Sequence, residues 1–173
     1  IGFCDIPEIT YGFGGAIEWK GFDVSIFFQG TARVSLFEEG STIVPFSSGY
    51  KNNDGFLRGV MENRWTVDNP DPNARYPRTI RPSDALDNNN TKKSSFWVRN
   101  AAFLRLKNAE IGYTFPKRWM EKMAIQNLRL YVSGVNLLTW APDVHLFDPD
   151  LGSGDGRKYP PTRVFNVGLN INF

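Results

Sequence analysis

The sequence predicts an all-β chain of about five long antiparallel strands, of the kind that cross a lipid bilayer. Apolar and polar residues alternate with a period of two over five segments, namely 9–19, 22–34, 103–115, 128–140 and 162–173. An ordinary strand has about 5–6 residues, whereas a tilted strand needs roughly 9–11 to cross a membrane. The length of these segments therefore favours transmembrane strands over the strands of a small globular domain.

The first two segments predict a hairpin. The apolar parity of 9–19 holds Tyr11, Phe13, Ile17 and Trp19. After the short turn Lys20-Gly21, the apolar parity of 22–34 holds Phe22, Val24, Ile26, Phe28, Gly30, Ala32 and Val34. Short turn residues between two alternating runs are typical of a β-hairpin.

The third segment changes face part of the way along. Leu104 and Leu106 have even parity, whereas Ala109 and Ile111 have odd parity. One extra residue near Lys107 would produce this change, so we expect a β-bulge there. Pro116 then opens a predicted short helix over 117–123, because proline suits the first position of a helix.

Alternation also marks the last two segments. In 128–140, Leu128, Leu130 and Val132 alternate with Arg129, Tyr131 and Ser133. In 162–173 the apolar parity holds Phe165, Val167, Leu169, Ile171 and Phe173, and the other parity holds Asn166, Gly168, Asn170 and Asn172. One face of each predicted strand is therefore apolar and the other polar.

The connections alternate in length. Those at 20–21 and 116–127 are short, and those at 38–102 and 141–161 are long. Outer-membrane barrels show this asymmetry, with short periplasmic turns and longer external loops. A compact domain rarely holds an irregular connection beyond about 12–15 residues, so 38–102 is expected to be a domain linker, a disordered segment or a functional surface loop.

Composition excludes several function classes. The chain has 173 residues and a net charge of +2, which argues against nucleic-acid binding because that function needs a basic face. Mean hydropathy is −0.35, and no apolar run reaches the roughly 18 residues of a membrane helix. The single cysteine excludes a cysteine-rich zinc site, and the single histidine, His145, argues against a His-based metal site or a Ser-His-Asp triad. We therefore expect no enzyme activity and no cofactor.

Several motifs resemble the closing strands of SusC/RagA-type TonB-linked outer-membrane transporters. They are Phe103–Asn108, Ile111–Thr114 with Pro116, Leu128–Gly134 with Asn136-Leu137, Phe147–Asp150, Tyr159-Pro160 and Gly168–Phe173. The segments Tyr11–Phe13, Lys20–Asp23 and Phe28–Gly30 resemble the strand pair that precedes them in the same family. The resemblance covers both ends of the chain and skips most of 38–102.

The resemblance implies that residues 1–173 are the C-terminal segment of a much larger barrel, with its plug and TonB-contacting region upstream of Ile1. It implies an outer-membrane importer of oligosaccharides or peptides that works with a SusD-like surface lipoprotein and the TonB complex, in contact with outer-membrane lipid. It also implies that Phe173 is an assembly signal for the barrel. The alternative is a soluble β-sandwich module that binds a ligand through its long loop.

Three groups of residues are candidate sites. Asp148, Asp150 and Asp155 form a glycine-rich acidic segment that is a weak candidate for calcium, although such residues are also common in turns. In the barrel interpretation Asn166, Asn170 and Asn172 face the lumen. The aromatic residues that could contact a ligand or a partner from the outer loop, or else pack the loop, are Tyr50, Trp65, Tyr76 and Trp97.

Overall fold

The chain folds into two compact units. The computed structural model describes residues 2–40, 43, 57–79, 90, 92–120, 125–154 and 157–173. The sheet unit comprises Glu8–Ala32, Ala102–Pro142 and Pro160–Phe173, and the loop unit comprises Ile1–Pro7, Arg33–Ala101 and Asp143–Tyr159. None of the helices in the described ranges is long and apolar enough to span a membrane.

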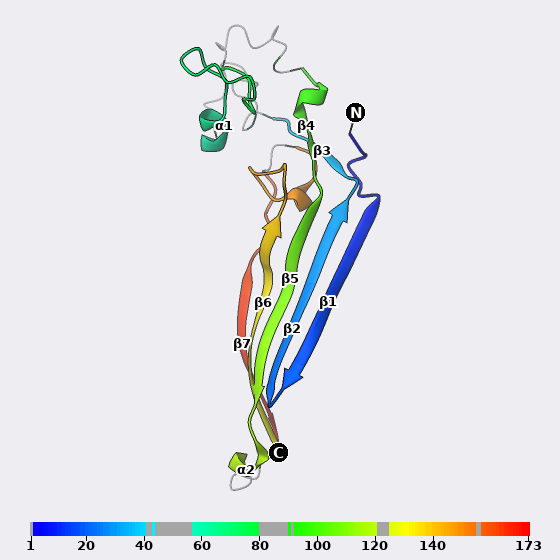
Figure 1. The fold of residues 1–173 in the computed structure, drawn as a ribbon, viewed down its shortest axis with the longest axis vertical. Helices are drawn as coiled ribbons and strands as arrows, with labels where there is room; N and C mark the ends of the chain where they lie inside the picture. Colours follow the sequence, from blue (N-terminus) through cyan, green and yellow to red (C-terminus); the bar gives the residue numbers. More distant parts are fainter. Residues whose placement is uncertain are drawn as a thin grey trace. The chain divides into compact units, whose positions relative to one another are not determined.

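The sheet unit is a five-stranded antiparallel meander (Figure 1). Its strands are β1 (Ile9–Trp19), β2 (Phe22–Ala32), β5 (Phe103–Thr114), β6 (Asn127–Trp140) and β7 (Val164–Asn172). They lie side by side in the order β1-β2-β5-β6-β7. The five long strands expected from the alternation are therefore present. The second ends at Ala32 rather than at residue 34, because Arg33 takes a left-handed φ of 52° that interrupts the extended backbone.

A two-residue turn joins β1 to β2. Lys20 and Gly21 have φ of 50° and 88°, and two positive values are typical of a type I′ turn, whose twist matches that of the flanking strands. The Gly21 carbonyl accepts a 2.7 Å hydrogen bond from the Thr114 N–H. A Cβ on Gly21 would lie 2.7 Å from the Thr114 carbonyl oxygen, so glycine is required both for φ and for space.

The expected bulge in β5 is confirmed at Lys107. Phe28 pairs with Leu106 and Phe27 with Asn108, so Lys107 has no partner in β2. On the other side, β6 inserts two residues, Asn136 and Leu137, opposite Lys107, and Asn136 has a φ of 55°. The bulge brings residues of even and odd parity in β5 to the same face of the sheet.

The connection 38–102 contains an ordered core of its own. The loop unit contains β3 (Ser35–Phe37) paired with β4 (Val98–Asn100), the helix α1 (Arg58–Glu62), and the 3₁₀ turns η4 (Ser95–Trp97) and η6 (Pro149–Leu151). Its core cluster holds Ile43, Val60, Tyr76 and Trp97, with Phe37, Leu57, Leu146 and Phe147 packed around them. The long connection is thus folded where the structure describes it.

The long connection begins and ends at one place. The Ala101 N–H donates a 3.0 Å hydrogen bond to the Val34 carbonyl, and Ser35 pairs with Asn100 in the β3–β4 ladder. We call this arrangement the clasp. At the opposite end of β5, the helix α2 (Lys117–Met120) follows Pro116, and the remainder of the helix predicted over 117–123 lies outside the described residues.

Candidate functional site

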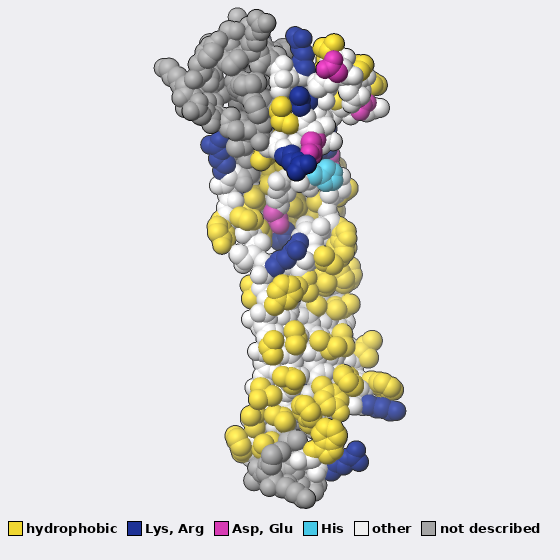
Figure 2. Space-filling model, turned by 90° about the vertical axis from the view of Figure 1, so that its left-hand side faces the viewer, with side chains coloured by type: hydrophobic (Ala, Val, Ile, Leu, Met, Phe, Trp, Pro, Cys, Tyr) yellow, Lys and Arg dark blue, Asp and Glu magenta, His cyan; other side chains and the backbone are white. Residues whose placement is uncertain are grey.

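One face of the sheet is apolar and exposed across all five strands. Register places Ile17, Val24, Ile111, Val132 and Val167 in a single row that runs from β1 to β7. These side chains are between 42% and 75% exposed. Figure 2 shows hydrophobic side chains covering the strands over much of their length. We call this surface the apolar face. An apolar patch of this extent marks contact with lipid or with another protein.

The opposite surface, the polar face, carries the other parity. One of its rows is Ala16, Ser25, Glu110, Ser133 and Asn166. Asn170 lies opposite Arg129, and Asn172 lies opposite Asn127. The structure therefore places the three candidate asparagines, Asn166, Asn170 and Asn172, on the polar face, together with charged and hydroxyl side chains of β2, β5 and β6.

An ion network ties three strands together on the polar face. The Arg129 guanidinium of β6 donates to Asp23 of β2, with Nε 3.0 Å from Oδ2, and to Glu110 of β5, with Nη2 2.6 Å from Oε1. Gly112 lies beneath this network, where a Cβ would come within 2.6 Å of Asp23 Oδ2. The sequence alone did not predict this network, because its members are brought together only by the strand order.

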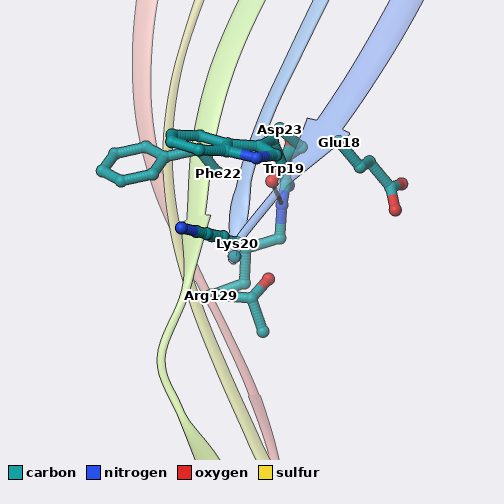
Figure 3. A pocket seen from close by; sticks show the side chains of 8 residues that line it. Glu18, Trp19, Lys20, Phe22, Asp23 and Arg129 are labelled. Carbon is teal, nitrogen blue, oxygen red and sulfur yellow. Dashed lines mark hydrogen bonds and ion pairs between the residues drawn. The ribbon is translucent and has the colours of Figure 1, made fainter.

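A cavity of about 600 Å³ lies at the turn end of the sheet. Figure 3 shows its lining side chains, with the Trp19 and Phe22 rings close to Lys20 and the Glu18 carboxylate directed away from them. Lys20 Nζ lies 4.8 Å from the centroid of the Trp19 ring, which is within cation–π range. Asp23 and Arg129 of the ion network complete the charged part of the lining.

The loop unit contains a buried ion cluster. The Glu38 carboxylate is fully buried and accepts a 2.8 Å hydrogen bond from Arg99 Nε, and Arg75 Nη2 lies 3.7 Å from its other oxygen. Arg75 also donates at 2.9 Å to Asp143, which accepts from the Asn100 N–H. Burial raises the pKa of Glu38 against the opposing effect of the two arginines. Burial also raises the pKa of Asp143. The hydrogen bonds from Arg75 and Asn100 outweigh this effect, so the pKa of Asp143 is lowered.

The candidate loop aromatics have different environments. Tyr76 and Trp97 are each only 2% exposed, with ring centroids 6.4 Å apart, and they form part of the loop core. Trp65 is half-buried, and Tyr50 lies outside the described residues. Of the two readings that the sequence left open for Tyr76 and Trp97, the structure favours packing over direct ligand contact.

The first carboxylate of the acidic segment 148–155 caps a short 3₁₀ turn. Asp148 Oδ1 accepts a 3.0 Å hydrogen bond from the Asp150 N–H and caps η6. Asp155 lies outside the described residues. Within the described part of the chain, no group of three Asp, Glu, His or Cys side chains is placed to hold a metal ion. His145 and Phe173 are both exposed.

Comparison with known proteins identifies the kind of molecule that contains these two faces. No protein-family model matches the chain. The TonB-dependent receptors P3 and P26 of Formosa agariphila are 30% and 29% identical to it, over 96% and 97% of this chain. The chain spans only 16% and 17% of the length of these two relatives.

Solved structures agree with the sequence relatives. The RagAB peptide importer in its 'closed-closed' state matches with a TM-score of 0.72 and 25% identity, covering 100% of this chain and 18% of that one. The same importer in its 'open-open' state matches with a TM-score of 0.62 and 25% identity, covering 97% of this chain and 17% of that one. The described sheet thus corresponds to part of a larger transport protein.

An antiparallel sheet with an exposed apolar face, matched to these proteins, is a portion of an outer-membrane β-barrel. The chain belongs to the TonB-dependent outer-membrane transporters of the SusC/RagA type. Its relatives are receptors and an importer, which are transport proteins rather than enzymes.

Proposed function

We propose that the sheet unit forms part of the wall of an energised importer that takes up oligosaccharides or peptides across the outer membrane. The observation that carries this proposal is the apolar row from Ile17 to Val167, exposed on every strand and backed by a polar face. Cargo would be captured outside, and movement of a plug coupled to the TonB complex would then admit it to the periplasm. No covalent step is needed.

The polar face would line the lumen. Asn166, Asn170 and Asn172 present amide groups that donate and accept hydrogen bonds, which suits a wet interior in contact with cargo or plug. The apolar face would meet lipid, because an exposed apolar surface of five strands is stable only where water is excluded. Phe173, 80% exposed after the end of β7, keeps its proposed role as an assembly signal.

The loop unit would lie outside the cell. All three of its segments connect to strands at the same end of the sheet, where Ile9 pairs with Ala32 and Leu104 pairs with Trp140. The short turns connect the strands at the opposite end. We propose that the 38–102 and 141–161 loops contact a SusD-like lipoprotein or the cargo. The likeness to the RagAB peptide importer supports peptides as one class of cargo.

Surface labelling tests this topology. In the full-length protein freed of other cysteines, Asn73→Cys probes the loop unit and Gln126→Cys probes the turn end. Both positions are exposed in the structure. We expect a membrane-impermeant maleimide to label Asn73→Cys on intact cells and to label Gln126→Cys only after lysis. The reverse pattern would overturn the proposed orientation.

The β-sandwich alternative lacks structural support. A sandwich needs a second sheet over the apolar face. In the described ranges the other sheet has only the three-residue strands β3 and β4, and Ile17 and Val167 are each 75% exposed. The apolar face therefore has no covering layer among the described residues.

A further inference from the structure

A chain of aromatic rings crosses the turn end of the apolar face. Phe22 of β2 lies 4.6 Å from Tyr113 of β5, Tyr113 lies 5.0 Å from Phe115, and Phe115 lies 6.1 Å from Trp119 of α2, measured between ring centroids. Trp19 pairs with Phe22 across the β1–β2 ladder and extends the chain to the first strand. We call these five residues the aromatic belt. Trp19 and Trp119, at its two ends, are both more than half exposed.

Cations flank both ends of the belt. Lys20 Nζ lies 4.8 Å from the centroid of the Trp19 ring, and Lys117 and Arg118 directly precede Trp119 in α2. All three basic side chains are exposed. Among the described residues, no carboxylate forms an ion pair with any of them, and the neighbouring Glu18 points away from Lys20 in Figure 3. Exposed basic side chains therefore lie at both ends of the belt.

This arrangement matches the chemistry of a phospholipid with a negatively charged headgroup. Acyl chains would lie along the apolar face, the glycerol region would meet the amphipathic rings, and the phosphate would reach the ammonium and guanidinium groups. Tryptophan and tyrosine prefer this interfacial depth, and each basic residue near an anionic surface favours binding.

We propose that the aromatic belt with Lys20, Lys117 and Arg118 binds anionic phospholipids of the inner leaflet. The inference rests on the proposed function, since it requires the apolar face to meet lipid and the turn end to face the periplasm. It adds a specific ligand class to that function: a phosphatidylglycerol-type headgroup rather than a zwitterionic one. Lys20 would hold the headgroup of one lipid at the β1–β2 turn, and Lys117 and Arg118 of α2 would hold the headgroup of a neighbouring lipid at the β5–β6 connection.

Lipid retention measures the site directly. The full-length transporter is reconstituted in nanodiscs of mixed phosphatidylglycerol and phosphatidylethanolamine, and the lipids that stay bound are counted by native mass spectrometry. The variant Lys20→Asn/Lys117→Gln/Arg118→Gln removes three charges, and asparagine tolerates the left-handed turn. We expect its preference for phosphatidylglycerol to fall roughly fivefold for each cation removed. The matched control, Arg78→Gln/Lys92→Gln/Arg157→Gln, removes three exposed charges of the loop unit and should retain the wild-type preference.

Each outcome decides the inference. A triple variant that inserts, transports and keeps the wild-type lipid preference would refute the site while leaving the proposed importer intact. A variant set that never enters the membrane, control included, would instead contradict the proposed function. Excess inorganic phosphate should not displace the retained lipid, because the acyl chains contribute to binding; displacement would mean that the site recognises free phosphate only.

Discussion

At the scale of single residues, neighbouring positions on β7 have opposite environments. Val167 lies in the middle of the apolar row, and Asn166 lies next to it on the polar face. An arginine at Val167 should destabilise the inserted barrel by about 2–4 kcal/mol, because the charge would be placed in the hydrocarbon region. The measurement is the free energy of unfolding of the full-length barrel in lipid vesicles.

The matched control is Asn166→Arg, which adds the same charge to the polar face. Asn166 pairs with Ser133, so the substitution introduces no like charge directly opposite, in contrast to Asn170, which pairs with Arg129. We expect Asn166→Arg to cost much less than Val167→Arg. Equal losses at the two positions would show that the faces are assigned wrongly.

The buried Glu38 makes the loop unit sensitive to pH. Because its pKa is raised above the usual 4.5, the folded unit binds more protons than the unfolded chain between pH 4.5 and the raised pKa. Stability should therefore fall as the pH rises through that window. The pKa of Asp143 is lowered from 3.8, so its effect on stability has the opposite sign. The stability that it contributes is lost only as the pH falls below that value.

Hydrogen exchange at one amide reports this effect. The Glu38 N–H donates at 2.9 Å to the Trp97 carbonyl, so its protection factor in the full-length protein follows local opening of the loop unit. We expect protection to decrease from pH 4.5 towards neutral pH, after correction for intrinsic exchange. In Glu38→Gln the dependence should disappear, since no proton is then exchanged at this side chain. A wild-type protection factor that increases over the same range would contradict the prediction.

Residue types alone did not predict which side chains are buried in the loop unit. Tyr76 and Trp97 carry the same sequence signal as an exposed sugar-stacking residue, and only the tertiary contacts show that they are core residues. Likewise Glu38 follows a strand in the sequence with nothing to mark it as buried. Its partners Arg75 and Arg99 lie far along the chain, and the fold alone brings them together.

At the scale of elements, the bulge at Lys107 controls the side on which β5 presents its residues. Deleting Lys107 alone would remove the extra residue and leave Leu104, Leu106, Ala109 and Ile111 on one continuous parity. Deleting Lys107 together with Asn108 would place Ala109 directly after Leu106, so one of the two apolar sets would turn to the polar face. We expect the double deletion to lower the fraction of folded, heat-modifiable barrel in outer membranes strongly. The deletion of Lys107 alone should leave that fraction near the wild-type level, and a comparable loss in both variants would contradict this account of the bulge.

The strands and their apolar and polar faces could be predicted from the sequence, because the alternation that defines them lies within one continuous segment of the chain. Even the bulge was visible, since a change of parity is a local signal. The ends of strands were less predictable: β2 stops where Arg33 takes a left-handed φ, which no periodicity reports. The Asp23–Arg129–Glu110 network was not predictable either, because Asp23 and Arg129 are 106 residues apart in the sequence.

At the scale of the molecule, the two units should respond separately to mutation. Tyr76→Ala removes a buried ring from the loop core, a change that costs about 3–5 kcal/mol for a large aromatic residue. We expect uptake to fall while the amount and heat-modifiability of the barrel stay unchanged, because none of the described core residues of the loop unit belongs to the five-stranded sheet. Radiolabelled cargo uptake and outer-membrane fractionation on the same cells provide the measurement.

Val167→Arg tests the other unit. It should lower the amount of folded barrel, and uptake should fall only in proportion to that amount. A Tyr76→Ala protein that disappears from the outer membrane would show that the units fold as one. Unchanged uptake with a demonstrably opened loop would show that the loop unit has no part in transport.

The clasp has a consequence for how such a protein can diversify. Because Val34 and Ala101 share one hydrogen bond, the chain leaves the sheet and returns at nearly the same point. An insertion whose ends already meet can be exchanged for another of different length and sequence without stretching the strands on either side. Recombination at these two residues would then supply new recognition loops on an unaltered membrane scaffold, and the same junction offers a grafting site for an engineered binding domain.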